Sequence, residues 1–85
     1  MKYEVIYDDD AIGFLAKLPK DVRMRIFNKV ADTKVNPLHF FERLEGRKDY
    51  KLRIGDYRAI ADIRKERIEV TMIGHRKNIY KRLDH

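Results

Sequence analysis

The sequence predicts an α+β fold in which two short helices lie on an antiparallel sheet. Apolar residues recur at helical spacing between residues 11 and 31, and from Tyr50 onwards they recur at every second position. Turn residues divide that second half into three strands. Helices followed by a run of strands are typical of helices packed on an antiparallel sheet. The length of 85 residues allows one domain, which we place over residues 1–85.

An N-terminal strand and a two-helix hairpin are expected first. Residues 3–7 alternate as a short strand, and aspartates 8–10 follow it as helix-capping residues. The first helix has one apolar face, made of Ala11, Phe14, Leu15 and Leu18. Pro19 ends this helix or opens the second, because proline is tolerated only in a first turn. The apolar face of the second helix is made of Val22, Ile26, Phe27, Val30 and Ala31.

Asn36-Pro37 stops the second helix, and residues 38–45 are open between one more helical turn and a loop. A three-stranded antiparallel meander follows. Gly55-Asp56 forms its first turn, where a leading glycine suits type II′, and residues 64–67 form the second. A short C-terminal helix from about Lys77 to Leu83 completes the predicted fold.

The two turns fix which strand residues share a face. Arg53 lies opposite Arg58, Ala59 opposite Met72, and Arg58 opposite Ile73 in the predicted register. One face is apolar and forms the core, with Leu52, Ile54, Ala59, Ala61, Ile63, Ile68, Val70 and Met72. The other face is half solvated, with Lys51, Arg53, Arg58, Ile60, Asp62, Glu69, Thr71, Ile73 and His75.

The whole net charge of +6 comes from the second half of the chain. Residues 1–42 contain 7 basic and 7 acidic side chains, whereas residues 43–85 contain 13 basic and 7 acidic ones. A lysine-rich solvated surface and a binding site for a polyanion explain the total equally well. The asymmetry favours the polyanion site, because nucleic-acid binding uses a basic patch on one face.

Several classes of protein are excluded or disfavoured. The chain has no cysteine, which excludes disulfides and Cys-ligated zinc, and its three histidines lack the HxxxH or HExxH spacing. It has no P-loop, GxGxxG motif or recognisable catalytic triad. No apolar run approaches the roughly 20 residues that cross a bilayer, and the N-terminus lacks a signal-peptide core. We expect a soluble cytoplasmic protein without a metal, a cofactor or a membrane partner.

One end of the half-solvated face carries the strongest functional indication. Lys51, Arg53 and Arg58 gather there, with His75 beside them in the predicted register. Like charges directly across a ladder destabilise a sheet, so Arg53 opposite Arg58 indicates an anion site. Alternatively, nearby carboxylates screen these arginines, and the candidates are Asp56, Asp62 and Glu69.

The C-terminal segment adds to this cluster. Arg76 ends the last strand, and Tyr80 lies one helical turn further on. A tyrosine near cations can stack on a base or hydrogen-bond to a phosphate, or it can simply pack on the sheet. Ile79 and Leu83 can do that packing instead, which leaves Tyr80 free.

The segments LEGRKDYKLRIGDYRAIADI and VTMIGHRKNIY resemble the RelE/ParE toxin superfamily, and the resemblance covers nearly the whole chain. It implies a RelE-like fold and a toxin of a type II toxin–antitoxin system. RelE-like members cut messenger RNA in the ribosomal A site without metal. The resemblance also implies an acidic RelB-like antitoxin, the ribosome and mRNA as partners, and a toxin–antitoxin heterotetramer as an assembly it can form.

The same resemblance implies catalytic roles for five residues in attack of a ribose 2′-OH on the adjacent phosphate. Arg53 and Arg58 would hold the phosphate, and Lys51 would act as base. Arg76 would stabilise or protonate the leaving oxygen, and Tyr80 would stack on a base. Further RNA contacts are expected from Lys48, His75, Lys77 and Lys81. His85 is either a C-terminal histidine of the kind that some members use or a mobile end.

Two other functions stay open. One is a ParE-like toxin that poisons DNA gyrase and has no nuclease activity. The other is an inactive relative that binds only antitoxin or RNA. Lys51, Arg53 and Tyr80 favour the nuclease, because ParE-like chains usually lack this constellation.

Overall fold

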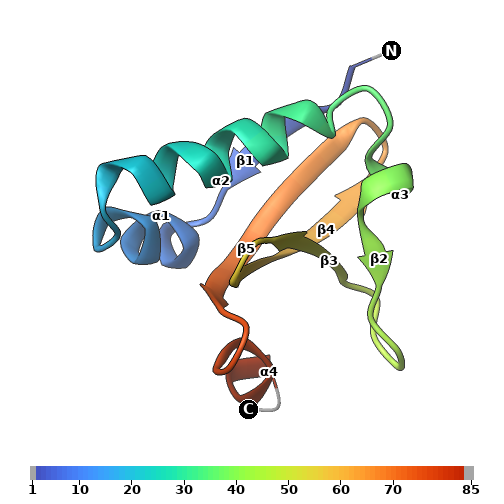
Figure 1. Cartoon of the computed structure of the whole chain (residues 1–85). Helices are drawn as coiled ribbons and strands as arrows, with labels where there is room; N and C mark the ends of the chain where they lie inside the picture. The colour runs from blue at the N-terminus through green and yellow to red at the C-terminus, as the bar shows by residue number, and fades with distance from the viewer. Residues whose placement is uncertain (1, 84–85) are drawn as a thin grey trace.

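Five strands form one mixed sheet in the order β1-β5-β4-β3-β2 (Figure 1). The computed structural model describes residues 2–83. Along the chain the elements are β1 (Glu4–Tyr7), α1 (Asp9–Ala16), α2 (Lys20–Asp32), α3 (Pro37–Phe40), β2 (Glu42–Arg43), β3 (Tyr50–Ile54), β4 (Tyr57–Arg64), β5 (Arg67–His75) and α4 (Ile79–Leu83). Only β1 runs parallel to its neighbour, and the other pairings are antiparallel. The predicted α+β class is therefore confirmed.

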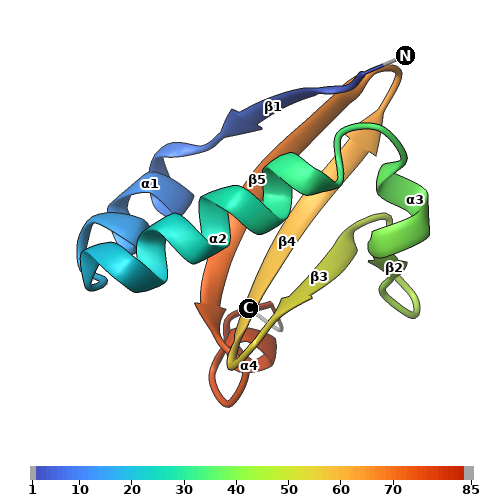
Figure 2. The same ribbon diagram turned by 45° about the horizontal axis from the view of Figure 1, so that its top comes forward.

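The helical hairpin α1–α2 covers one face of the sheet, as Figure 2 shows. The predicted apolar stripes point into the core, and their fully buried members are Ala11, Leu15, Ile26 and Val30. Pro19 is the N-cap of α2, so it opens the second helix. The stripe of α2 is narrower than predicted, because Ala31 is exposed.

The two edge strands extend the predicted three-stranded meander. β1 pairs with the first half of β5, and Tyr7 at its end packs edge-on against Phe27 of α2 at 5.3 Å between ring centroids. The Tyr7 hydroxyl is partly buried, and its burial raises the pKa of this group to about 12. Residues 38–45 resolve into the helical turn α3 followed by the two-residue strand β2, which pairs with β3.

Both predicted hairpin turns are present, but the β4–β5 ladder contains a bulge. Ala61 lies opposite Val70 as predicted, whereas Ile60 lies opposite Met72, so Thr71 is one extra residue in β5. The Thr71 hydroxyl donates a hydrogen bond to the Ile60 carbonyl at 3.3 Å. From the bulge to the C-terminal end of β5, each side chain therefore lies on the face opposite to the one that the predicted register gave it.

The bulge corrects three predicted positions. Ile73 lies opposite Ala59 and is fully buried under the helices, and Met72 leaves the core. His75 lies opposite Tyr57 and packs edge-on against its ring at 5.6 Å, so it is turned away from the arginines of the other face. The prediction failed here because alternation of residue types does not reveal where a strand carries an extra residue.

The corrected register makes a measurable difference between two adjacent residues. We expect Ile73→Ala to lower the free energy of unfolding by about 2–5 kcal/mol, because it opens a cavity in the core. Met72→Ala should cost clearly less, because Met72 is only half-buried. Urea unfolding of both variants provides the measurement, and a larger loss for Met72→Ala would contradict the bulge.

Candidate functional site

The β3–β4 hairpin sets two arginines side by side on the face opposite the helical hairpin. Gly55 has φ +58°, which a two-residue turn of the predicted type needs at its first position. Ile54 therefore pairs with Tyr57, and Arg53 pairs with Arg58 as predicted. Lys51 lies two residues before Arg53 on the same face. We call Lys51, Arg53, Arg58 and Arg76 the cationic cluster.

The Arg58 guanidinium is held over its own turn. Its Nη1 donates to the carbonyl oxygens of Gly55 and Tyr57, both at 2.8 Å. These bonds fix the direction of the side chain, and Nη2 and Nε can still donate to a phosphate. Arg58 is therefore preorganised for an anion, which limits the entropy lost on binding.

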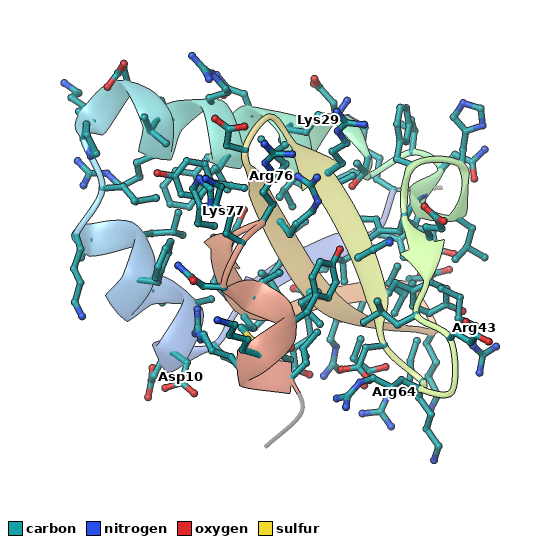
Figure 3. The ribbon with its side chains drawn as sticks, turned by 60° about the horizontal axis from the view of Figure 1, so that its bottom comes forward. Asp10, Lys29, Arg43, Arg64, Arg76 and Lys77 are labelled. Atoms are coloured by element: carbon teal, nitrogen blue, oxygen red, sulfur yellow. The ribbon has the colours of Figure 1, made fainter. Side chains whose placement is uncertain are left out.

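Arg76 joins the cluster at the end of β5. Its backbone N–H donates to the Asp56 carbonyl at 2.8 Å, and its Nε lies 3.6 Å from the Asp56 carboxylate. Both side chains are more than half exposed, at 53% and 71%. Such a surface pair contributes little to stability, so Arg76 can exchange Asp56 for a bound phosphate at small cost. Figure 3 shows Arg76 beside Lys77 at this end of the sheet.

The helix α4 brings Tyr80 to the cluster. The Lys51 ammonium lies 5.7 Å from the centre of the Tyr80 ring, within the range of a cation–π contact. Ile79 is fully buried, whereas Tyr80 is 39% exposed. As the sequence predicted, Ile79 packs on the sheet and leaves the Tyr80 ring accessible to a base.

The carboxylates that could neutralise the arginines all have other partners. Asp56 pairs with Arg76, Asp62 pairs with Arg64 at 3.0 Å, and Glu69 lies beside Asp8. Within residues 2–83, no carboxylate lies within 4.0 Å of the charged groups of Arg53 or Arg58. The positive charge of these two arginines is therefore available to a ligand.

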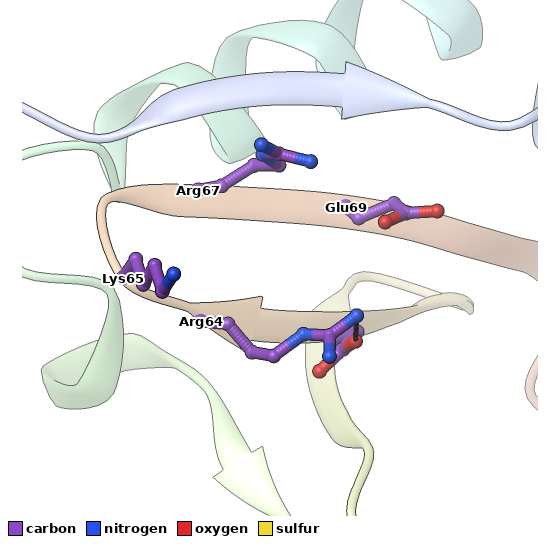
Figure 4. Close-up of a pocket in the computed structure, with 5 residues that line it drawn as sticks. Arg64, Lys65, Arg67 and Glu69 are labelled. Atoms are coloured by element: carbon purple, nitrogen blue, oxygen red, sulfur yellow. Dashed lines mark ion pairs between the residues drawn. The ribbon is translucent and has the colours of Figure 1, made fainter.

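The other half of the same face has mixed charge. A cavity of 180 Å³ lies there, close to the β4–β5 turn, and Figure 4 shows the side chains that line it. It is lined by Asp62, Arg64, Lys65, Arg67 and Glu69. The hydrogen bond to Asp8 and the negative charge of Asp8 raise the pKa of Glu69. With acidic and basic groups interleaved, this half is a poorer anion site than the cationic cluster.

Of the remaining predicted RNA contacts, the three lysines lie around the cluster, whereas His75 lies on the other face of the sheet. Lys48 is exposed in the β2–β3 loop, Lys77 follows Arg76, and Lys81 is exposed on α4. His75 faces Tyr57, and its Nδ1 accepts a hydrogen bond from the Lys77 backbone N–H at 3.2 Å. His85 lies outside the described residues.

Three arginines near the site were not predicted to belong to it. Arg25 of α2 reaches the β3–β4 turn, where its Nη1 lies 4.0 Å from the place of a Cβ on Gly55. Arg47 donates to the Leu83 carbonyl, and Arg82 donates to the Ile73 carbonyl. The weak indication in the sequence for Arg25 is its place on the polar side of α2. The contacts of Arg47 and Arg82 join distant segments and left no local signal.

The described residues give no indication of a metal site or a membrane span. Between residues 2 and 83, no three His, Asp or Glu side chains gather as potential metal ligands. None of the helices in this part of the chain is both long and apolar enough to cross a membrane.

Comparisons with known proteins agree with this architecture. The family model described as "ParE toxin of type II toxin-antitoxin system, parDE" matches residues 5–80. No curated protein matches the chain.

Several solved structures of toxins share the fold. The toxin–antitoxin complex RelBE2 from Mycobacterium tuberculosis aligns at TM-score 0.79 and 22% identity, over 88% of this chain and 99% of that one. The archaeal RelE–RelB complex from Pyrococcus horikoshii aligns at TM-score 0.74 and 26% identity, over 89% and 97%. The intact RelBE complex of E. coli aligns at TM-score 0.72 and 25% identity, over 86% and 95%.

The fold and the family match define a toxin of a type II toxin–antitoxin system. The chain belongs to the ParE toxin family. This family lies within the RelE/ParE superfamily, which the hairpin and C-terminal motifs predicted.

The cationic cluster should bind phosphate-like anions in preference to the opposite end of the sheet. In an NMR titration with sulfate, we expect the Nε–Hε signals of Arg53, Arg58 and Arg76 to shift more than those of Arg64 and Arg67. The shifts should weaken as sodium chloride is added, because salt screens exposed charges. Equal shifts at both ends of the sheet would contradict the assignment.

Proposed function

We propose that this toxin is a ribosome-dependent, metal-independent endoribonuclease that cuts mRNA in the A site. The observation that carries the proposal is the Lys51–Tyr80 contact, which brings a basic group and an accessible aromatic ring together. Beside them lie Arg53 and Arg58, which have no carboxylate partner within residues 2–83. Phosphoryl transfer to a ribose hydroxyl needs preplaced positive charge, a base and a means of orienting the nucleotide. The site supplies all three.

The proposed reaction is an in-line displacement within the RNA. The 2′-oxygen attacks the adjacent phosphorus, the uncharged amine form of Lys51 takes the 2′-OH proton, and the bond to the 5′-oxygen breaks. The products are a 2′,3′-cyclic phosphate and a free 5′-OH. Arg53 and Arg58 hold the phosphate oxygens, which gain negative charge in the transition state. Arg76 stabilises the leaving 5′-oxygen, which water protonates.

Tyr80 has a positioning part in this scheme. Stacking on a base is worth about 1–3 kcal/mol by alanine substitution, and it fixes the nucleotide against the cluster. Lys48, Lys77 and Lys81 lie around the cluster, and we assign them to contacts with RNA on either side of the cleaved bond. His75 is turned away from the arginines and has no assigned contact. The ribosome supplies the strand in a defined conformation.

The cellular partners follow from the relatives. The solved relatives named above are complexes of RelE with RelB, so we propose a RelB-like antitoxin for this toxin in the cytoplasm. The net charge of +6 favours an acidic antitoxin, because complementary charge speeds association. A toxin–antitoxin heterotetramer is the assembly to test first, by light scattering of the co-expressed pair.

A ParE-like poison of DNA gyrase is the second candidate, since the matching family model is named for ParE. In that case the cationic cluster would contribute only to affinity. Replication would stop in cells that express the toxin, and messages would stay intact.

Primer extension on a message undergoing cell-free translation separates these functions. We expect the wild-type toxin to give discrete cuts in phase with codons. Arg58→Ala should lower the cleavage rate by roughly 10²–10³-fold, the range for losing one group that stabilises a transition state. Tyr80→Ala should lower it by roughly 5–150-fold, because stacking on a base is worth about 1–3 kcal/mol.

The matched control is Arg64→Ala, which removes an arginine from the other end of β4 and should cleave like the wild type. Near-wild-type cleavage by both Arg58→Ala and Tyr80→Ala would overturn the site. Intact messages together with inhibited gyrase would favour the second candidate. If the toxin neither cuts messages nor inhibits gyrase, it is an inactive relative.

A further inference from the structure

The position of Tyr80 depends on a helix that cannot hold itself in place. α4 has only five residues, Ile79–Leu83, and isolated helices of that length are unstable in water. Contacts with the sheet must therefore fix it. Ile79 provides the apolar contact, since it is fully buried. A single apolar anchor allows a short helix to rotate, so a second contact is needed to direct the Tyr80 ring.

Arg82 supplies a directional contact on the next turn of α4. Its Nη1 donates to the Ile73 carbonyl at 2.9 Å, and its guanidinium carbon lies 5.6 Å from the centre of the Phe14 ring. The helix is thereby tied both to the β5 backbone and to α1. A charged donor on a backbone carbonyl makes a stronger hydrogen bond than a neutral one.

The Ile73 carbonyl belongs to an open stretch of sheet edge. β1 pairs with β5 only from Arg67 to Val70, and the chain then turns away as Asp8 donates to the Val70 carbonyl at 2.9 Å. Among residues 2–83, the rest of β5 has β4 on one side and no strand on the other. Arg82 therefore occupies an edge position that a neighbouring strand would otherwise take.

Gly74 makes this close approach feasible. A Cβ at residue 74 would lie 2.8 Å from Arg82 Nη1 and 2.8 Å from Ile79 Cδ1. Atoms that close must shift, and Ile79 is fully buried. Any side chain at this position would thus push on Arg82 and Ile79 at once, which are two of the residues that hold α4.

We propose that Arg82 is a positioning residue for Tyr80, held by the open edge of β5 at Ile73 and Gly74. By fixing α4, it keeps the Tyr80 ring over the Lys51 ammonium. The expected effect of Arg82 on the cleavage rate rests on the proposed nuclease function. Its expected effect on the position of the Tyr80 ring does not.

Arg82→Met tests this proposal, because it keeps the length of the side chain and removes the guanidinium. We expect cleavage in the translation assay to fall roughly tenfold. The double variant Arg82→Met/Tyr80→Ala should cleave no more slowly than Tyr80→Ala alone, because both changes remove the same contribution. The proposal would be overturned if the loss in the double variant equalled the product of the two single losses. Wild-type cleavage by Arg82→Met would overturn it as well.

NMR of the purified full chain provides a readout that does not need activity. In Arg82→Met the amide and side-chain signals of Tyr80 and Lys51 should shift as the two groups separate. Arg67→Met, the same substitution at the other end of β5, should leave them in place. Unchanged Tyr80 and Lys51 signals in Arg82→Met would overturn the proposal.

Gly74→Ala gives a second test with Arg82 intact, and it guards against a folding defect of the first variant. It should shift the same Tyr80 and Lys51 signals, and a lack of any shift would count against the close approach. If the wild-type toxin cuts no message while Arg82→Met still separates Tyr80 from Lys51, the nuclease function fails and the positioning role stands.

Discussion

Thr71 is the extra residue in β5, and its hydroxyl bonds to the Ile60 carbonyl across the ladder. This one insertion determines what both faces of the sheet carry beyond it. Ile73 turns into the core under the helices, and Gly74 turns to the opposite face, where α4 packs. A β5 strand without the bulge would present Ile73 at the place where α4 needs a residue without a side chain. The core and the site therefore share one backbone constraint.

The electrostatics of the sheet are arranged by the same backbone. A fixed two-residue turn pairs Arg53 with Arg58, and this pairing opposes folding because the charges are alike. Backbone carbonyls hold Arg58, while nearby carboxylates are bound to other groups. Uncompensated charge of this kind is typical of functional sites, where local stability is sacrificed for ligand binding. Near the β4–β5 turn, by contrast, acidic side chains lie among the basic ones, and no such mixture surrounds Arg53 and Arg58 within residues 2–83.

Membership of the family explains the fold more completely than it explains the chemistry. Toxins of the RelE/ParE superfamily share one scaffold, and a scaffold alone does not specify what is bound or cut. Particular side chains on β3, on β4, after β5 and on α4 therefore support the proposed nuclease. Tyr80 is central to it, because its ring comes to Lys51 from a separate element.

Local patterns in the sequence determined much of this protein. Helical spacing predicted the buried faces of α1 and α2, and turn chemistry at Gly55 predicted the pairing of Arg53 with Arg58. Motifs along β3 and the C-terminal segment predicted the RelE/ParE superfamily. These features depend on residues close together in the chain, so local propensity and periodicity suffice to reveal them.

Only the tertiary structure decided the rest. The bulge at Thr71, the parallel pairing of β1 and the strand β2 depend on long-range hydrogen bonds, which leave no period in the sequence. The face on which His75 lies followed from the bulge. The position of α4 depends on the hydrogen bond from Arg82 to the Ile73 carbonyl and on the close approach of Ile79 to Gly74. Contacts between distant segments are set by packing and by which backbone groups remain unpaired, and neither can be read from the order of the residues alone.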